Sequence, residues 1–166
     1  MRSNNILLLI GCAGVGKTWV LNSLLKFYKC TETKKIGKFY FHSNDKIIVV
    51  GKYDGSTFQG SDRLSMSIMT DLDKFLEYSK NKFVILEGDR FTNSTFINKA
   101  NPTIIRINGD GSIGRLNRGS EQTERQLKSI STRIKNIELT NWDFQVDSSQ
   151  KAYELVKLIF KEYDKN

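Results

Sequence analysis

The chain has 166 residues, 39% hydrophobic and 27% charged, which suits a single globular domain spanning residues 1–166. It has no apolar run of about 18 residues, so we expect no membrane span. Its one histidine, His42, argues against histidine-based metal sites and Ser-His-Asp triads. Lysine and arginine outnumber aspartate and glutamate by 26 to 18, and the resulting net charge of +8 suggests a polyanionic partner.

The N-terminus, MRSNN, leads directly into a strand-like run and lacks the apolar core and cleavage site of a signal peptide. We therefore expect a cytoplasmic protein. The two cysteines, Cys12 and Cys30, form no regular spacing, so we expect reduced thiols and no disulfide-linked partner.

Short apolar runs predict five strands, mostly parallel, at residues 5–10, 46–50, 82–86, 103–107 and 142–146. Helical spacing of apolar residues predicts helices at residues 17–28, 64–79, 115–137 and 151–163. Alternating strands and helices predict the α/β class, with a doubly wound, mostly parallel five-stranded sheet and flanking helices. Because ligands bind beyond the carboxyl ends of parallel strands, we expect the loops there to share one crevice.

The first of these loops, GCAGVGKT, matches G-x-x-x-x-G-K-[ST] between a predicted strand and a predicted helix. We call it the glycine loop. Its backbone N–H groups and the helix N-terminus predict a cradle for the phosphates of ATP. Lys17 is expected to reach the outer phosphates and Thr18 to ligate Mg²⁺. The expected nucleotide-binding residues are Gly11, Cys12, Ala13, Gly14, Val15, Gly16, Lys17 and Thr18.

Two carboxylates, Glu87 and Asp89, follow the strand predicted at residues 82–86 and precede Arg90. Either carboxylate can hold a Mg²⁺-bound water and complete the shell that Thr18 begins. The spacing does not distinguish the two carboxylates. The plainer interpretation is a surface turn with a local ion pair.

Asp62 and Arg63 precede the helix predicted at residues 64–79. Asp62 can accept the proton of an attacking substrate hydroxyl, although it can also simply cap the helix. Arg63 and Arg90 are candidates to hold substrate phosphates or to neutralise developing charge.

Aromatic residues lie in and after the same loops, namely Tyr53, Phe58, Phe91 and Phe96. Aromatic faces next to flexible glycine suit the stacking of a flat base. Each of these side chains can equally belong to the core.

The amphipathic stretch 115–137 predicts a lid, in a region of approximately 110–137, with arginines along one polar stripe. Arg118 and Arg125 are expected to stabilise the transferring phosphoryl group, and Arg133 is expected to contact ATP. The alternative is an ordinary solvated, charged helix face.

With these motifs the chain resembles small P-loop nucleotide and nucleoside kinases, and more narrowly a group of short viral kinases. The resemblance rests on GKYDGSTFQGSDRLSM, EGDR and RLNRGSEQTERQLKSISTRIKNI, and it spans roughly residues 6–146. We associate this pattern with phage kinases that phosphorylate 5-hydroxymethyluracil bases within DNA. The resemblance implies a P-loop NTPase fold, ATP and Mg²⁺, DNA as partner and the host cytoplasm as location. It places Lys17 and Thr18 at ATP·Mg²⁺, Asp62 and Asp89 near the acceptor, and the late arginines in a lid.

Three functions fit the sequence. The first is a kinase whose acceptor is a hydroxymethyl pyrimidine in DNA. The second is a kinase for free nucleosides or nucleoside monophosphates, with Arg63 or Arg90 holding the monophosphate. The third is a nucleotide-binding ATPase or switch module without an acceptor.

Overall fold

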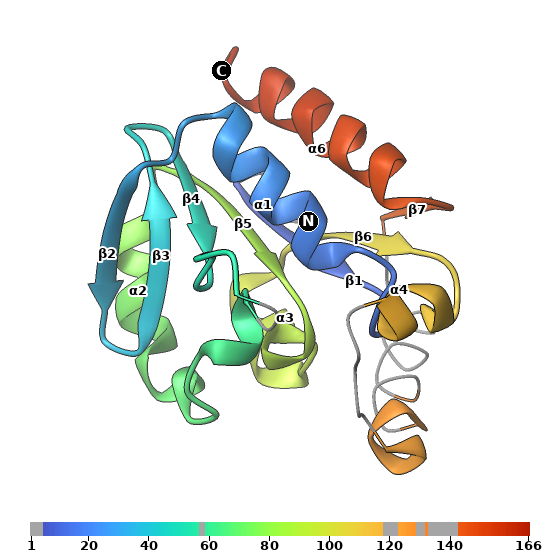
Figure 1. The fold of residues 1–166 in the computed structure, drawn as a ribbon. Helices are drawn as coiled ribbons and strands as arrows, with labels where there is room; N and C mark the ends of the chain where they lie inside the picture. The colour runs from blue at the N-terminus through green and yellow to red at the C-terminus, as the bar shows by residue number, and fades with distance from the viewer. Residues whose placement is uncertain (1–4, 57–58, 118–122, 129–131, 133–142) are drawn as a thin grey trace.

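A computed structural model describes residues 5–56, 59–117, 123–128, 132 and 143–166 of the chain. A mixed seven-stranded sheet lies at the centre of this α/β fold, with helices on both of its faces (Figure 1). Across the sheet the strands are β2 (Glu32–Ile36), β3 (Phe39–Ser43), β4 (Ile47–Val50), β5 (Phe83–Glu87), β1 (Ile6–Ile10), β6 (Thr103–Ile107) and β7 (Phe144–Val146).

The five predicted strands are present as β1, β4, β5, β6 and β7, and each pairs in parallel with its neighbours in that group. The expected total of five strands is wrong, because β2 and β3 form an antiparallel hairpin that pairs with β4 at the sheet edge. The sequence of β2, ETKKI, is polar and almost entirely exposed, so it lacks the apolar run by which a buried strand is found.

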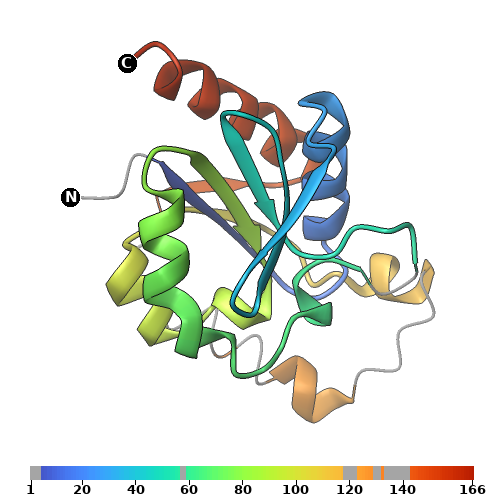
Figure 2. The same cartoon turned by 90° about the vertical axis from the view of Figure 1, so that its left-hand side faces the viewer.

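Each face of the sheet has its own hydrophobic core. Leu7 and Leu9 of β1 point to the face covered by α1 (Lys17–Phe27) and α6 (Ser149–Tyr163). Leu8 points to the other face, covered by α2 (Leu72–Ser79) and α3 (Ser94–Ala100). Figure 2 shows the hairpin in front, with α1 on one side of the sheet and α2 and α3 on the other. The alternation of side chains along a strand thus buries β1 on both faces.

The helix predicted at residues 64–79 begins later than expected. The segment opens with two 3₁₀ turns, η1 (Ser61–Arg63) and η2 (Ile68–Asp71), and α2 starts at Leu72. Leu64 is extended, and Ser65 Oγ accepts a hydrogen bond from the backbone N–H of Ser67 at 3.3 Å. Local bonds of this kind compete with the helix ladder, so the apolar spacing alone misplaced the helix start.

The stretch 115–137 is not one continuous helix. A short helix, α4 (Ser112–Asn117), precedes residue 118, and a second helical segment runs over residues 124–128. Thr123, between them, is not helical and caps the second segment: its Oγ1 accepts from Gln126 N at 3.2 Å, and its own N–H donates to Gln126 Oε1 at 2.9 Å. This reciprocal pair is a capping box, which starts a new helix.

Two expected absences concern membranes and disulfides. Within the described ranges, no helix has the length and hydrophobicity needed to cross a membrane. Neither Cys12 nor Cys30 forms a disulfide in the part of the chain that the structure describes.

The hairpin is joined to the rest of the core through aromatic rings. Phe75 of α2 stacks on Phe39 of β3, with ring centroids 4.2 Å apart and planes 4° from parallel, and both rings are fully buried. We expect Phe75→Ala to lower the free energy of unfolding by about 3–5 kcal/mol, because the cavity cannot close around a stacked pair. Leu158→Ala, at an exposed site on α6, should change it by less than about 0.5 kcal/mol. Denaturant unfolding measures both, and equal losses would contradict this packing.

Candidate functional site

The glycine loop follows β1 and ends in the first turn of α1. Gly11, Gly14 and Gly16 all have positive φ, which a residue with a Cβ rarely adopts. The Lys17 ammonium donates hydrogen bonds to the carbonyls of Gly11 at 2.7 Å and of Cys12 at 3.0 Å. The lysine charge therefore lies directly over the loop that the sequence predicts to hold phosphates.

A second glycine-rich segment, residues 108–111, packs against the glycine loop, and we call it the NGDG loop. A Cβ on Gly14 would lie 2.2 Å from the carbonyl oxygen of Gly111, and a Cβ on Gly111 would lie 1.9 Å from that of Ala13. The two backbones thus touch with no room for side chains. The sequence marks both loops as glycine-rich but does not show that they touch.

Arg115, on α4, fastens the two loops together. Its Nη1 donates to the carbonyl of Ala13 at 2.7 Å and to that of Asp110 at 2.5 Å. The sequence analysis did not select Arg115 as a site residue. The available signal was an arginine following the NGDG loop by a single helical turn.

The carboxylate of Glu87 lies at the end of β5, facing the glycine loop. Thr18 Oγ1 donates to Glu87 Oε1 at 3.3 Å, and the backbone N–H of Ser61 also donates to this carboxylate. Glu87 is only 3% exposed. Burial raises its pKa above the usual value, while Lys17 acts in the opposite direction and Asp62 adds to the rise. The structure therefore places Glu87, rather than Asp89, beside the threonine hydroxyl.

Tyr53 and Gly60 close the site around Glu87 from the loop that follows β4. The buried Tyr53 hydroxyl contacts both Glu87 and the carbonyl of Val50, the latter at 3.4 Å. Burial raises the pKa of Tyr53, and the charges of Glu87 and Asp62 raise it further. A Cβ on Gly60 would lie 2.6 Å from Glu87 Oε1, so only glycine lets this loop approach the carboxylate.

The hydroxyl oxygen of Ser61 is a buried polar atom that no described group of the protein hydrogen-bonds. A Cβ on Gly88, the residue after Glu87, would lie 2.5 Å from this oxygen. Buried hydroxyls normally have partners, so a bound water or substrate hydroxyl is the expected complement.

The two arginines expected at the acceptor side are engaged by other groups. Arg63 forms an ion pair with Asp54, a carboxylate that the sequence analysis did not single out. This hydrogen bond lowers the pKa of Asp54. Arg90 donates to the backbone carbonyls of Leu64 at 3.3 Å and of Asp62 at 3.5 Å. Arg90 thus holds η1 in place, and it leaves the exposed Asp62 side chain beside Glu87.

The remaining expected residues are placed as follows. Asp89 opens η3 (Asp89–Phe91) and is partly exposed. Arg125 is exposed on the helical segment 124–128, whereas Arg118 and Arg133 lie outside the described residues. The structure therefore gives no position for those two lid arginines.

Of the two interpretations of the aromatic side chains, stacking on a base or packing in the core, the structure shows the second for Phe91 and Phe96. Both rings are fully buried and pack on each other, with centroids 5.2 Å apart, in the core beneath α2 and α3. The Tyr53 ring also lies in a core, on the α1 side. Phe58 lies outside the described residues.

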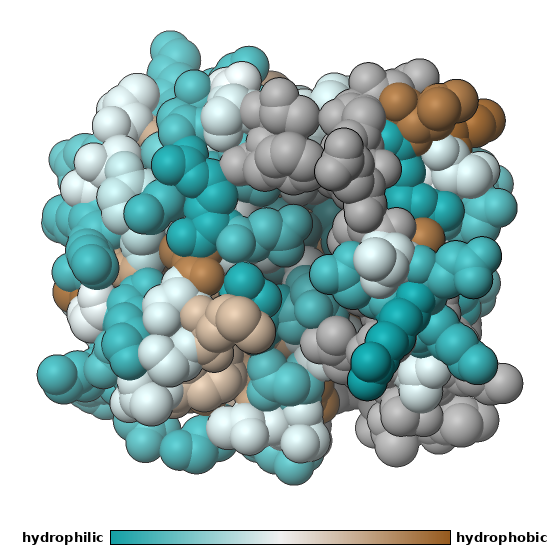
Figure 3. All heavy atoms as spheres, turned by 60° about the horizontal axis from the view of Figure 1, so that its bottom comes forward, coloured by the Kyte–Doolittle hydropathy of each residue, from teal (hydrophilic) through white to brown (hydrophobic). Residues whose placement is uncertain are grey.

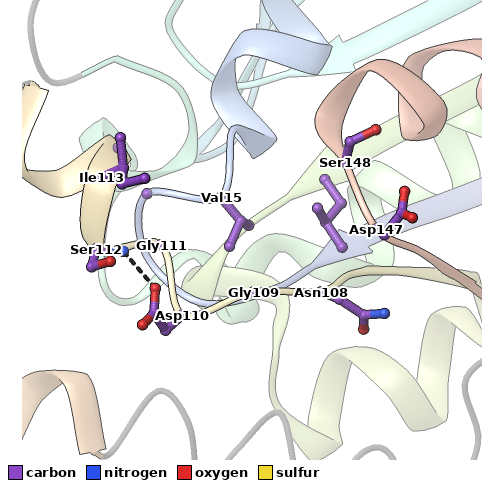
Figure 4. Close-up of a pocket in the computed structure, with 12 residues that line it drawn as sticks. Val15, Asn108, Gly109, Asp110, Gly111, Ser112, Ile113, Asp147 and Ser148 are labelled. Carbon is purple, nitrogen blue, oxygen red and sulfur yellow. Dashed lines mark hydrogen bonds between the residues drawn. The ribbon is translucent and has the colours of Figure 1, made fainter.

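A pocket of about 190 Å³ adjoins the glycine loop. It is formed by the glycine loop, the NGDG loop, the start of α4 and the turn between β7 and α6. In Figure 4, Asp110 and Ser112 lie at one side, Asp147 and Ser148 at the other, and Val15 between them; the dashed line joins Ser112 N to Asp110 Oδ1 at 2.9 Å. The lining combines the backbone of four glycines with the apolar side chains of Val15, Ile107 and Ile113 and the polar side chains at the two sides.

The donor set fits Mg²⁺ better than a metal caged by protein alone. No group of three or more His, Cys, Asp and Glu side chains with the geometry of a metal site occurs among the described residues. Mg²⁺ characteristically binds one or two protein oxygens together with waters and substrate phosphates. The hydroxyl of Thr18 and the carboxylate of Glu87 are such oxygens, and they already lie 3.3 Å apart.

Comparison with known proteins adds no relative: no protein-family model matches the chain, and no curated protein matches it.

The contact between the two glycine-rich loops predicts a difference between two alanine substitutions. Gly111 and Gly55 both have positive φ, but a Cβ on Gly111 collides with Ala13, whereas a Cβ on Gly55 meets nothing within 4 Å. Gly55→Ala should cost about 1 kcal/mol of stability from backbone strain alone. Gly111→Ala should cost about 3 kcal/mol or more and should also weaken nucleotide binding. Denaturant unfolding and nucleotide titration measure these effects, and equal costs would show that the loops do not touch.

The raised pKa of Glu87 predicts how stability responds to pH. A carboxyl whose folded-state pKa is raised above its ordinary 4.5 destabilises the fold as pH rises through and above that value. Glu87→Gln should therefore be more stable than the natural chain at neutral pH. The difference should shrink as pH falls towards about 4. Thermal or denaturant unfolding across pH 4–8 checks the trend, and a variant that is less stable at neutral pH contradicts it.

Proposed function

We propose that this chain has a P-loop NTPase fold and is a phosphotransferase that uses ATP and Mg²⁺. The observation that carries the proposal is the contact of Thr18 with the buried Glu87, beside Lys17 and at the edge of a glycine loop. A threonine hydroxyl and a strand-end carboxylate on the two sides of a phosphate cradle are the protein's share of a nucleotide-bound magnesium site.

On binding ATP, the Lys17 ammonium exchanges the carbonyls of Gly11 and Cys12 for the outer phosphates. Thr18 and Glu87 would hold Mg²⁺, which would supply neutralisation of the phosphate charge. The pocket beside the NGDG loop takes the nucleobase, because it adjoins the same glycine loop. Four glycines contribute to its lining, and Asp110 and Asp147 stand at its two sides, where they can accept hydrogen bonds from a base or a sugar.

Asp62 is our candidate for the general base. Its exposed carboxylate stands beside Glu87, in the turn that Arg90 holds. As the acceptor oxygen attacks the terminal phosphorus, its proton passes to Asp62. The new O–P bond forms while the bond to the bridging oxygen of ADP breaks, and ADP leaves with that electron pair.

The acceptor we propose is the hydroxymethyl group of 5-hydroxymethyluracil in DNA, with phage DNA modification as the setting. The net charge of +8 suits a polyanion. Arg63 and Arg90, the candidates to hold a free monophosphate, are bonded here to Asp54 and to backbone carbonyls. A base within a duplex has to leave the stack before its hydroxyl can reach Asp62.

The test is phosphate transfer from terminally labelled ATP with Mg²⁺ to four acceptors. These are DNA containing hydroxymethyluracil, the same DNA with thymine, free nucleosides, and nucleoside monophosphates. Label in the hydroxymethylated DNA alone supports the proposal. Label in a free nucleoside or nucleotide indicates a small-molecule kinase, and release of inorganic phosphate alone indicates an ATPase or switch. Lys17→Ala should abolish every one of these activities.

Two aspartate variants separate chemistry from binding. Asp62→Asn should lower turnover about a hundredfold with little change in ATP affinity, because only the proton acceptor is lost. Asp73→Asn removes an exposed carboxylate on α2 that is paired with Lys99, and it should leave turnover within about twofold. Steady-state kinetics and ATP titration measure both. Near-normal turnover of Asp62→Asn would reassign the base.

A further inference from the structure

The β2–β3 hairpin has one covered face and one open face. Lys34 pairs across the hairpin with Phe41, whose ring lies 5.9 Å from that of Phe75 on α2. Lys35 pairs with Tyr40, and Thr33 pairs with His42, so these residues alternate onto the opposite face, although the half-buried Tyr40 also packs against the core beneath α2 and α3. The core beneath α1 and α6 includes Ile47 and Val49 of β4 but no residue of β2 or β3. No described helix therefore covers the second face, as Figure 2 shows.

Aromatic rings and ammonium groups meet on this open face. The Tyr40 and His42 rings make an edge contact, with centroids 5.7 Å apart and planes at 80°. Lys52 Nζ lies 5.4 Å from the centroid of the Tyr40 ring. Lys35 of β2 is the residue paired with Tyr40 across the hairpin. Asp54, the carboxylate whose charge acts on His42, forms an ion pair with Arg63. The face thus offers partly exposed rings in a positive field.

The open face is continuous with the proposed acceptor site. The backbone N–H of Tyr53 donates to His42 Nε2 at 3.2 Å, and the Tyr53 hydroxyl contacts Glu87. Lys52 and Gly60 exchange backbone hydrogen bonds at 3.1 and 2.6 Å in an isolated bridge, so Lys52 lies opposite a residue two positions before Asp62. A chain lying on the hairpin would reach η1 directly.

In Figure 3, which brings the bottom of Figure 1 forward, hydrophilic residues dominate the surface and hydrophobic groups are few and separated.

We propose that the open face of the hairpin (Thr33, Lys35, Tyr40 and His42), together with Lys52, binds a single-stranded segment of the acceptor DNA and leads it to Asp62. Lysines neutralise backbone phosphates, and an aromatic ring stacks on a base. A duplex hides its base faces, so the ring selects an unpaired strand. The proposal rests on the proposed function for its choice of DNA, but the binding itself needs neither ATP nor catalysis.

Neighbouring lysines on opposite faces of β2 give a matched test. The probe is a fluorescent oligothymidylate of about 16 nucleotides, without ATP, titrated by anisotropy at several salt concentrations. The Lys35→Gln, Lys52→Gln double variant should lower the salt slope by about 1.4, or about 0.7 for each phosphate that a lysine no longer neutralises. Lys34→Gln removes the same charge from the opposite face of β2, where the half-exposed Lys34 lies 3.9 Å from Glu32, and it should leave the slope unchanged. Equal effects at Lys34 and Lys35 would mean that these lysines only protect an edge strand, and would overturn the proposal.

The stacking contact has its own control. Tyr40→Ala should weaken binding about tenfold, whereas Tyr40→Phe, which keeps the ring, should bind within about twofold of the natural chain. Thermal unfolding identifies any variant that has lost its fold, and the solvent-facing lysine variants keep the test decisive in that case. Tighter binding of a duplex than of the single strand overturns the proposal, as does failure of the oligonucleotide to bind.

Failure of the hairpin proposal and failure of the proposed function look different. If labelled phosphate enters hydroxymethylated DNA but the double variant has an unchanged KM for that DNA, only the hairpin proposal fails. If the double variant loses oligonucleotide binding while no DNA is phosphorylated by the natural chain, only the proposed function fails. If both hold, the double variant raises the KM for DNA and leaves the KM for ATP unchanged.

Discussion

The Glu87 carboxylate is buried at the end of β5, and the surrounding site is built from the groups that make this burial possible. An unpaired buried carboxylate is costly, and Thr18, Ser61 and Tyr53 supply its hydrogen bonds from three different segments. These same bonds fix the spacing between the glycine loop and η1. The buried carboxylate of Glu87 thereby sets the distance between the glycine loop, which would hold the donor phosphates, and Asp62 in η1, which would take the acceptor's proton.

The interior of the sheet was predictable from sequence, whereas its edge was not. Parallel strands buried on both faces appear as continuous apolar runs, and β1, β4, β5 and β6 were found in this way. The strand β2 is exposed, and it is held by its pairing with β3 and by the rings of Phe39 and Phe41 packing on α2. Those ring contacts join residues more than thirty positions apart along the chain, so no local sequence pattern predicts them.

The residues of the candidate site likewise divide into those that the sequence predicted and those that it did not. The glycine loop was found because its spacing is local and its chemistry demands particular residues. Arg115, Asp54 and the Tyr53 hydroxyl were missed, since each acts on a group that only the fold brings near. The choice between Glu87 and Asp89 was also beyond the sequence. Glu87 and Asp89 are separated by one residue, and the spacing does not tell which of them is buried at the end of the strand. In the structure the buried carboxylate is that of Glu87.

The bond between Arg115 and Ala13 joins residues 102 positions apart, and it has a consequence for synthesis on the ribosome. The glycine loop leaves the exit tunnel before the backbone against which it packs has been made. A nascent chain that stops before α4 carries the full GCAGVGKT motif without the contacts that shape it. The glycine loop therefore takes its final shape only after β5, β6 and α4 have been made.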